Sequence, residues 1–397
     1  MNSNSVIVIF YNRLYNPLII KELKKSFYEV YSLFIDEGKI GDVEEIELEC
    51  MAAGADHFIY KDYRAQFANN IISKAIKANA IYQEGYHLSA ALSRPALAEA
   101  AVEVAEELGI DYIAHQFRGN DQVRMDMNIE ILGKKPLASL RHFSYTDEDV
   151  YKYAINYGIP LEFGCNNPYS TSENMWGLTI ECGDLEYPDN QIPEDVKQVI
   201  SRAANDSAKP IVVSVTFEKG IPIKLNNKEK EIHQIIKELN DIGGRYLTGV
   251  FDMVEDGVVG LKSRAIYQSP AAHILITAHK QLELFCSNRH ENWFKETIDK
   301  KWTEMVYSGL WYDPLMDHLN AFIDSVNSNV NGVISLEIGK YYVRVISRHS
   351  DTSIYDPTMA IYNCGHLYSQ SDAEGFSKIF NIHSKCSAIK KRKQHDS

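Results

Sequence analysis

A short central segment carries residue types that recognise charged small molecules. The run Gly119-Asn120-Asp121-Gln122-Val123-Arg124 places a carboxylate and a guanidinium close together in the chain. An arginine can clamp a carboxylate with two parallel hydrogen bonds. Simpler interpretations stay open, because Asn120 and Asp121 could cap the following helix, and Arg124 could form a structural ion pair.

The spacing of cysteine and histidine does not predict a metal centre. None of the six cysteines forms a CxxC pair, and their spacing fits neither a zinc site nor a disulfide framework. His273 and His279 lack a third ligand for zinc. We expect no metal and reduced thiols, as in cytoplasmic proteins. The cysteines are Cys50, Cys165, Cys182, Cys286, Cys364 and Cys386.

The first third of the chain alternates short apolar runs with helical patterns, which predicts βαβ units and a parallel sheet. The expected strands are residues 6–10, 30–35, 58–60 and 112–114. The expected helices are residues 17–27, 43–53, 65–78 and 95–108, with prolines in the first turn of the first and last. Ligands bind beyond the carboxyl ends of such strands, so residues 11–16, 36–39 and 115–124 form the expected functional edge.

From about residue 166 the pattern changes to that of an α+β domain. Residues 165–174 read as a polar loop, residues 211–217 and 341–346 as strands, and residues 232–239 as a short helix. We therefore predict an α/β domain over residues 1–165, an α+β domain over residues 166–365, and a C-terminal segment over residues 366–397.

Composition excludes some classes of protein. The formal net charge of -13 argues against a general nucleic-acid surface, and the basic run at 390–393 reads as a solvated tail. No apolar run approaches the length of about 18 residues that a membrane span needs. The apolar run at residues 6–10 lacks the flanks of a signal peptide, so we expect a cytoplasmic protein.

Several segments resemble the argininosuccinate synthase family in order and spacing. Residues 119–124 match that family's G-N-D-Q-V-R, and Tyr86-His87-Leu88 with Ser93-Arg94-Pro95 is similar to its Y-L-L-G-T-S-L-A-R-P. Residues 167–174 resemble N-P-[WY]-S-x-D-x-N, and residues 254–267 resemble V-E-N-R-x-x-G-M-K-S-R-G-x-Y. Residues 306–311 and 372–376 match two C-terminal motifs. So many matches in sequence order make chance resemblance untenable.

The resemblance implies a function and a site. Members of the family adenylate the ureido oxygen of citrulline with ATP, and the aspartate amine then displaces AMP. Their fold is a nucleotide-binding α/β domain of the adenine nucleotide alpha hydrolase type plus a synthetase domain, usually in a homotetramer. Asn120 and Asp121 match aspartate-binding residues, and Asp121 would receive the ammonium or orient the attacking amine. The citrulline-binding positions would be Tyr86, Arg124, Ser170, Thr179, Glu255 and Tyr267. Glu255 could accept from an ammonium or a guanidinium, and a structural ion pair is the alternative interpretation.

Two loops that hold ATP in the family differ here. The family's A-Y-S-G-G-L-D-T-S corresponds to residues 9–17, so Tyr11, Asn12 and Arg13 replace the serine and both glycines. Glycine lets backbone N–H groups approach phosphate oxygens, and Pro17 removes one such donor. The family's H-G-A-T-G-K-G-N corresponds to the shorter run at residues 115–120. The hydroxyl-bearing T-S pair of the family is Ala90-Ala91 here.

Two hypotheses follow. The first is a divergent ligase that still joins citrulline, or a related ureido amino acid, to aspartate and needs ATP and Mg²⁺. The second, which we favour, is a relative that binds a citrulline-, arginine- or aspartate-type amino acid without normal adenylation and without a cofactor. Both retain a small-molecule partner and a homo-oligomer. Arg13 and Arg118 together could bind another anion, although surface ion pairing is the simpler interpretation.

Overall fold

A parallel sheet forms the first half of the chain. The computed structural model describes residues 4–13, 15–38, 41–139, 147–156, 169–205, 209–358 and 369–395. The sheet has the order β3-β2-β1-β4-β5, and all neighbouring strands are parallel. Its strands are β1 (Ser5–Phe10), β2 (Glu29–Asp36), β3 (His57–Asp62), β4 (Tyr112–His115) and β5 (Lys135–Ala138). The expected strands and the α/β fold class are confirmed.

Helices connect these strands, as the alternating pattern predicts. They are α1 (Asn16–Leu23), α2 (Val43–Ala52), α3 (Arg64–Gln66), the π-helical turn η1 (Phe67–Ile72), α4 (Ser73–Lys77), α5 (Ser89–Leu108), α6 (Gly119–Ile131) and α8 (Asp147–Asn156). The prediction for residues 65–78 is confirmed in position, but the π-helical turn interrupts the α-helix. Helix α1 ends at Leu23, four residues before the predicted end.

The predicted start of the long Ala-rich helix at residue 95 is wrong. Helix α5 begins at Ser89, so Pro95 lies inside it. The first N–H groups of a helix need partners from outside, and the hydroxyl of Tyr86 accepts from Ala90 N at 3.0 Å and Ala91 N at 3.1 Å. Tyr86 therefore extends the helix towards the strand ends.

Two antiparallel sheets follow, in agreement with the α+β prediction. The second sheet has the order β10-β9-β8-β13-β14, and the third has the order β11-β12-β7-β6. The strands are β6 (Tyr169–Asn174), β7 (Gly177–Cys182), β8 (Ile211–Glu218), β9 (Ile221–Leu225), β10 (Lys228–Glu229), β11 (Val250–Asp256), β12 (Lys262–Gln268), β13 (Gly332–Gly339) and β14 (Tyr342–His349). The helices are η2 (Gly183–Glu186), α9 (Glu194–Ile200), α10 (Ile232–Arg245), α11 (Pro270–Cys286), α12 (Arg289–Tyr307) and α13 (Pro314–Asn327).

One sequence interpretation of this half needs correction. The run at residues 165–174 was expected to be a loop, but residues 169–174 form β6, which pairs with β7. Polar residues lie on both faces of the strand, and Ser170 and Ser172 are on the face that carries the site described below, which explains why no apolar pattern marks the strand. The predicted domain boundary, with Cys165, lies outside the described residues and stays a prediction.

Two compact units divide the chain. Met1–Thr352 form the first, and Ser353–Ser397 form the second, which contains α14 (Gln370–Phe380) and α15 (Ile382–His395). The side chain of Ser369 caps α14 by accepting from Asp372 N at 3.2 Å. Among the described residues, no helix is long and apolar enough to cross a membrane.

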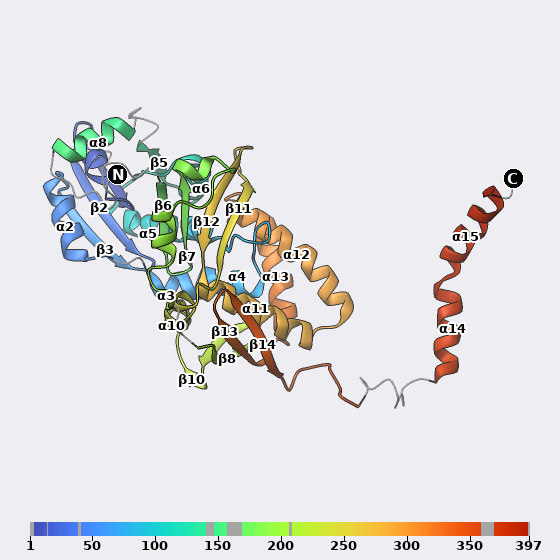
Figure 1. Ribbon diagram of the computed structural model, residues 1–397. Coiled ribbons are helices and arrows are strands. Elements are labelled where there is room, and N and C mark those ends of the chain that lie inside the picture. The colour runs from blue at the N-terminus through green and yellow to red at the C-terminus, as the bar shows by residue number, and fades with distance from the viewer. Residues whose placement is uncertain are drawn as a thin grey trace. The chain divides into compact units, whose positions relative to one another are not determined.

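Helix α5 is the layer that two sheets share (Figure 1). It contacts β1, β2 and β4 of the parallel sheet and β6 and β7 of the third sheet, and it also packs against α6. Most of its residues are buried, and the alanines along it allow close approach from both sides. Side chains from the strand ends, α5, α6 and the third sheet therefore meet in one place.

A buried histidine provides a test of this packing. His87 is fully buried beside Phe251 and His273, with ring centroids 5.4 and 5.7 Å away. Burial and then the His273 charge lower the pKa of His87 from 6.5 to about 3, against the effect of the Gly85 backbone. Between these values the unfolded chain binds a proton that the folded chain does not, so stability falls as pH drops below 6.5.

We expect His87→Leu to flatten the acid side of the stability profile. Removing the His87 imidazole should reduce the acid-induced loss in the free energy of unfolding by up to about 1.4 kcal/mol per pH unit. Urea unfolding at a series of pH values between neutrality and mild acid measures the effect. The control is the same substitution at the exposed His318, which should leave the slope unchanged. A His87→Leu slope equal to that of the unsubstituted protein would contradict the expectation.

Candidate functional site

Strand alternation places the polar side chains of the third sheet on one face. Residues two apart in a strand share a face, as do residues directly opposite on a neighbouring strand. The register pairs Ser170 with Glu181, Ser172 with Thr179, and Thr179 with Tyr267. Glu255 of β11 belongs to the same face, because Phe251 in the same strand pairs with Tyr267. The sheet thus brings together Ser170, Thr179, Glu255 and Tyr267, four of the predicted residues, although Ser170 itself is exposed.

Tyr86 joins this face to the start of α5. Its ring stacks on the ring of Tyr267, with centroids 4.2 Å apart. Its hydroxyl is held by the helix N–H groups, and burial raises the pKa of Tyr86. Nearby, Ser89 and Thr179 share a hydrogen bond of 3.4 Å. Ser89 thus supplies a hydroxyl next to Ala90 and Ala91, which carry none.

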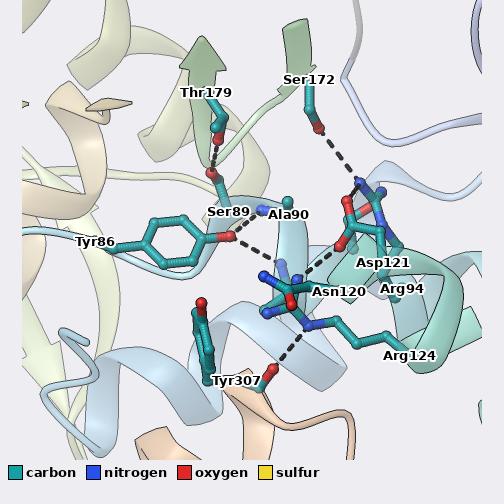
Figure 2. A network of polar contacts seen from close by, with 12 residues as sticks. Tyr86, Ser89, Ala90, Arg94, Asn120, Asp121, Arg124, Ser172, Thr179 and Tyr307 are labelled. Atoms are coloured by element: carbon teal, nitrogen blue, oxygen red, sulfur yellow. Dashed lines mark hydrogen bonds and ion pairs between the residues drawn. The ribbon is translucent and has the colours of Figure 1, made fainter. Parts of the chain in front are cut away.

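Asp121 lies between two arginines at the centre of the site (Figure 2). Its Oδ1 accepts from Arg124 Nη1 at 2.7 Å, and its Oδ2 accepts from Arg94 Nη2 at 2.6 Å. Burial favours the neutral acid, but the charges of Arg94 and Arg124 outweigh it and lower the pKa of Asp121 to about 2. Asp121 is therefore a permanent anion with both oxygens engaged.

Each of the two arginines keeps an unused hydrogen-bond donor. Arg124 Nε donates to Tyr307 O at 2.7 Å, while its Nη2 is buried without a partner among the residues the structure describes. The same holds for Nε of Arg94, whose side chain is fully buried. A buried donor without a partner costs about 1–3 kcal/mol, which an anionic ligand would recover. Sequence analysis did not single out Arg94, although it lies in a matched motif.

Glu255 is held by two tyrosines. Tyr267 Oη donates to its Oε2 at 2.7 Å, and Tyr307 Oη donates to its Oε1 at 2.8 Å. Burial raises the pKa of Glu255, and the two hydroxyls oppose that rise. Glu255 is therefore not in a simple structural ion pair, which was the alternative interpretation.

A second acid on this face was not anticipated. Glu181 of β7 lies two residues beyond Thr179, opposite Ser170 and Ala265. Burial, followed by the charges of Asp121 and Glu255, raises the pKa of Glu181 to about 7. Its position two residues after a predicted hydroxyl residue in a strand was the signal that could have found it.

The two loops that differ from the family pattern contact each other. The Tyr11 ring packs on Phe117 with centroids 4.6 Å apart, and the Arg94 guanidinium lies 4.8 and 4.2 Å from the two ring centroids. The amide of Gln116 fits with its oxygen towards the first loop, where it accepts from Tyr11 N at 2.8 Å and Asn12 N at 2.5 Å. Tyr11 Oη also hydrogen-bonds Ser172 of β6.

Arg13 is occupied by acids of α2. Its Nη2 lies 2.6 Å from Glu45 Oε2, and its Nε lies 3.4 Å from Glu49 Oε2. The Arg118 guanidinium lies 5.1 Å from the centroid of the Tyr15 ring. These contacts favour the interpretation of Arg13 as an ion-paired arginine over that of an anion site.

Asn120 and Asp121 do not cap a helix. The residue at the N-cap of α6 is Arg118, without a side-chain cap bond, and Asn120 and Asp121 lie in the first turn. Asn120 Oδ1 accepts from Val259 N at 3.4 Å, at the turn between β11 and β12. The capping interpretation is therefore wrong, and the side chain of Asp121 is committed to the arginines. In the described part of the chain, no group of three potential metal ligands forms.

We expect Asp121→Asn to destabilise the fold strongly. The substitution leaves Arg94 and Arg124 buried with no carboxylate between them, which should cost about 3–5 kcal/mol in the free energy of unfolding. Urea denaturation measures the loss. The matched control is Asp252→Asn, which breaks the exposed two-pronged pair with Arg264 and should cost less than about 1 kcal/mol. Equal small losses would show that other groups balance the arginines.

Comparison with known proteins agrees with this geometry. Residues 5–160 match the family described as Arginosuccinate synthase N-terminal HUP domain, and residues 169–387 match Arginosuccinate synthase C-terminal domain. The argininosuccinate synthase of Dictyoglomus turgidum is 37% identical over 395 residues, covering 98% of this chain and 99% of that protein. Those of Pyrococcus furiosus and Sulfurisphaera tokodaii are 37% and 36% identical over 384 residues, covering 96% of this chain and 93% and 97% of theirs. The resemblance inferred from the motifs is confirmed, and the chain belongs to the argininosuccinate synthase family.

Proposed function

We propose that this chain binds a citrulline- or arginine-type amino acid and does so without the ATP-dependent adenylation that the family resemblance implies. The observation that carries the proposal is the contact between the two altered loops. Gln116 takes the backbone donors of Tyr11 and Asn12, and the Tyr11 and Phe117 rings fill the space around Arg94.

The amino-acid part of the proposal rests on complementary charges. The unused donors, Nε of Arg94 and Nη2 of Arg124, suit a carboxylate, which could accept one charge-assisted hydrogen bond from each arginine. Glu255, whose carboxyl accepts from two tyrosine hydroxyls, suits an ammonium or a guanidinium. Tyr86, Thr179 and the stacked Tyr267 line the same face. These features support an amino acid with a polar or cationic end.

The nucleotide part rests on a test of fit. Phosphate groups bind where backbone N–H groups and a helix N-terminus are free to approach their oxygens. Here two of those N–H groups already donate to Gln116, and Pro17 at the start of α1 has none. The residues present therefore fit a triphosphate poorly, and we derive no step through one.

A second candidate is the family's own reaction, ATP- and Mg²⁺-dependent condensation of citrulline with aspartate to argininosuccinate. Membership of the family favours it, as does retention of Asn120 and Asp121 at the aspartate-binding positions. In this candidate Asp121 would receive the aspartate ammonium on lone pairs that its two arginine bonds leave unused. Homo-oligomerisation through residues 366–397 and a cytoplasmic location belong to both candidates.

We expect citrulline or arginine to raise the melting temperature of the purified protein, and ATP–Mg²⁺ to add nothing. A ligand at about 100 times its Kd stabilises by about 2.7 kcal/mol, which a thermal-shift assay detects easily. Argininosuccinate and aspartate complete the ligand set, and the synthase of D. turgidum serves as the positive control for ATP. A shift with ATP–Mg²⁺, or AMP formed from ATP, citrulline and aspartate, would establish the second candidate instead.

Glu255→Gln should weaken binding of the amino acid. Loss of a hydrogen bond to a charged group is worth about 1.5–3 kcal/mol, so calorimetry should show affinity falling by about 10- to 150-fold. The matched control is Glu173→Gln, because Glu173 lies on β6 with its side chain on the opposite face of the same sheet. Unchanged affinity in Glu255→Gln would place the ligand's cation elsewhere.

A further inference from the structure

Tyr307, the last residue of α12, contacts both Glu255 and Arg124 of the site. Tyr307 Oη donates to Glu255 Oε1 at 2.8 Å, and Tyr307 O accepts from Arg124 Nε at 2.7 Å. Figure 2 shows the bond between the Tyr307 carbonyl and Arg124. Glu255 comes from β11 and Arg124 from α6, so a single residue of a third element links the acid to the arginine.

Packing fixes the position of Tyr307. Its ring stacks on Tyr82, with centroids 3.7 Å apart and planes inclined by 8°, and the Arg124 guanidinium lies 4.7 Å from its centroid. Gly309 follows with φ at +80°, and a Cβ there would lie 3.0 Å from Arg124 Cγ. The contacts with Tyr82 and Arg124 therefore restrict the positions of the hydroxyl and the carbonyl of Tyr307.

The electrostatic consequences act on both charges. The carboxyl end of a helix carries a partial negative charge, so the carbonyl at the end of α12 favours the arginine cation. The hydroxyl stabilises the charged form of Glu255, which burial opposes. Glu255 therefore depends on the hydroxyl of Tyr307, and Arg124 depends on the carbonyl of the same residue.

We propose that Tyr307 is a positioning residue that holds the Glu255 carboxyl and the Arg124 guanidinium in place, and so fixes the pair of groups that receives the cation and the carboxylate of an amino acid. The proposal rests on the proposed function, because that function supplies the ligand. It adds the specificity rule that a ligand must offer a cation to Glu255 and a carboxylate to Arg124 at a set separation.

Tyr307→Phe separates positioning from packing. The ring stack and the carbonyl bond to Arg124 remain, while Glu255 loses one of its two donors. Loss of a hydrogen bond to a charged group should raise the pKa of Glu255 by about one unit or more. We expect calorimetric affinity for citrulline and arginine near that of the unsubstituted protein at alkaline pH, and lost on acidification at a pH about one unit higher.

A measurement without ligand keeps the two proposals apart. Carbon-13 NMR of protein labelled at the glutamate carboxyl carbon, with the Glu255 signal identified by Glu255→Gln, reports the pKa of Glu255 directly. The control is Tyr82→Phe, which keeps the stack and loses a hydroxyl that donates to Asp256 O at 2.8 Å. It should leave the Glu255 titration unchanged.

The outcomes differ for the two proposals. A Glu255 titration that is the same in Tyr307→Phe and in the unsubstituted protein overturns the role of Tyr307, whether or not an amino acid binds. A shifted titration in a protein that binds none of the amino acids supports the role of Tyr307 and overturns the proposed function.

Discussion

The ion pairs that Asp121 makes with Arg94 and Arg124 are the interaction on which the rest of the site depends. Three charges lie together where α5 and α6 meet, and their mutual contacts help to offset the loss of hydration. Two cations against one anion leave an excess positive charge. The facing sheet supplies Glu181 and Glu255, so its polar face must be turned towards α5 and α6. The charge balance therefore sets how the two halves of the site are oriented.

The loops that contain Tyr11 and Phe117 are tied to the same ion pairs through Arg94. Tyr11 and Phe117 are far apart in the chain, yet both rings lie against this one guanidinium. Tyr11 also reaches Ser172 of the third sheet, so the first loop connects the parallel sheet to the polar face. The aromatic rings of these two loops pack against each other and against one guanidinium, as close packing of the interior requires.

The sequence predicts those features that depend on neighbours in the chain. The buried parallel strands read as apolar runs because both of their faces are covered. The start of α5 was predicted wrongly because proline favours the first turn of a helix. In the structure the first turn begins at Ser89, and the hydroxyl of Tyr86 accepts from its N–H groups. The motifs identified Asp121 and Glu255. Glu181 was missed because its role arises from strand register. Tyr307 was missed because it lies 183 residues from Arg124 and 52 residues from Glu255 in the chain.

The nature of the charges also limits what the site can accept. An amino-acid zwitterion brings one carboxylate and one ammonium, so it exchanges existing partners without changing the net charge of the buried cluster. Binding the zwitterion therefore adds little to the desolvation free energy that the buried charges of the unliganded site already carry. A triphosphate would add several negative charges beside a loop whose Arg13 is paired with Glu45 and Glu49 and whose backbone donors are used. The geometry of pairs and donors thus favours the zwitterion on electrostatic grounds alone.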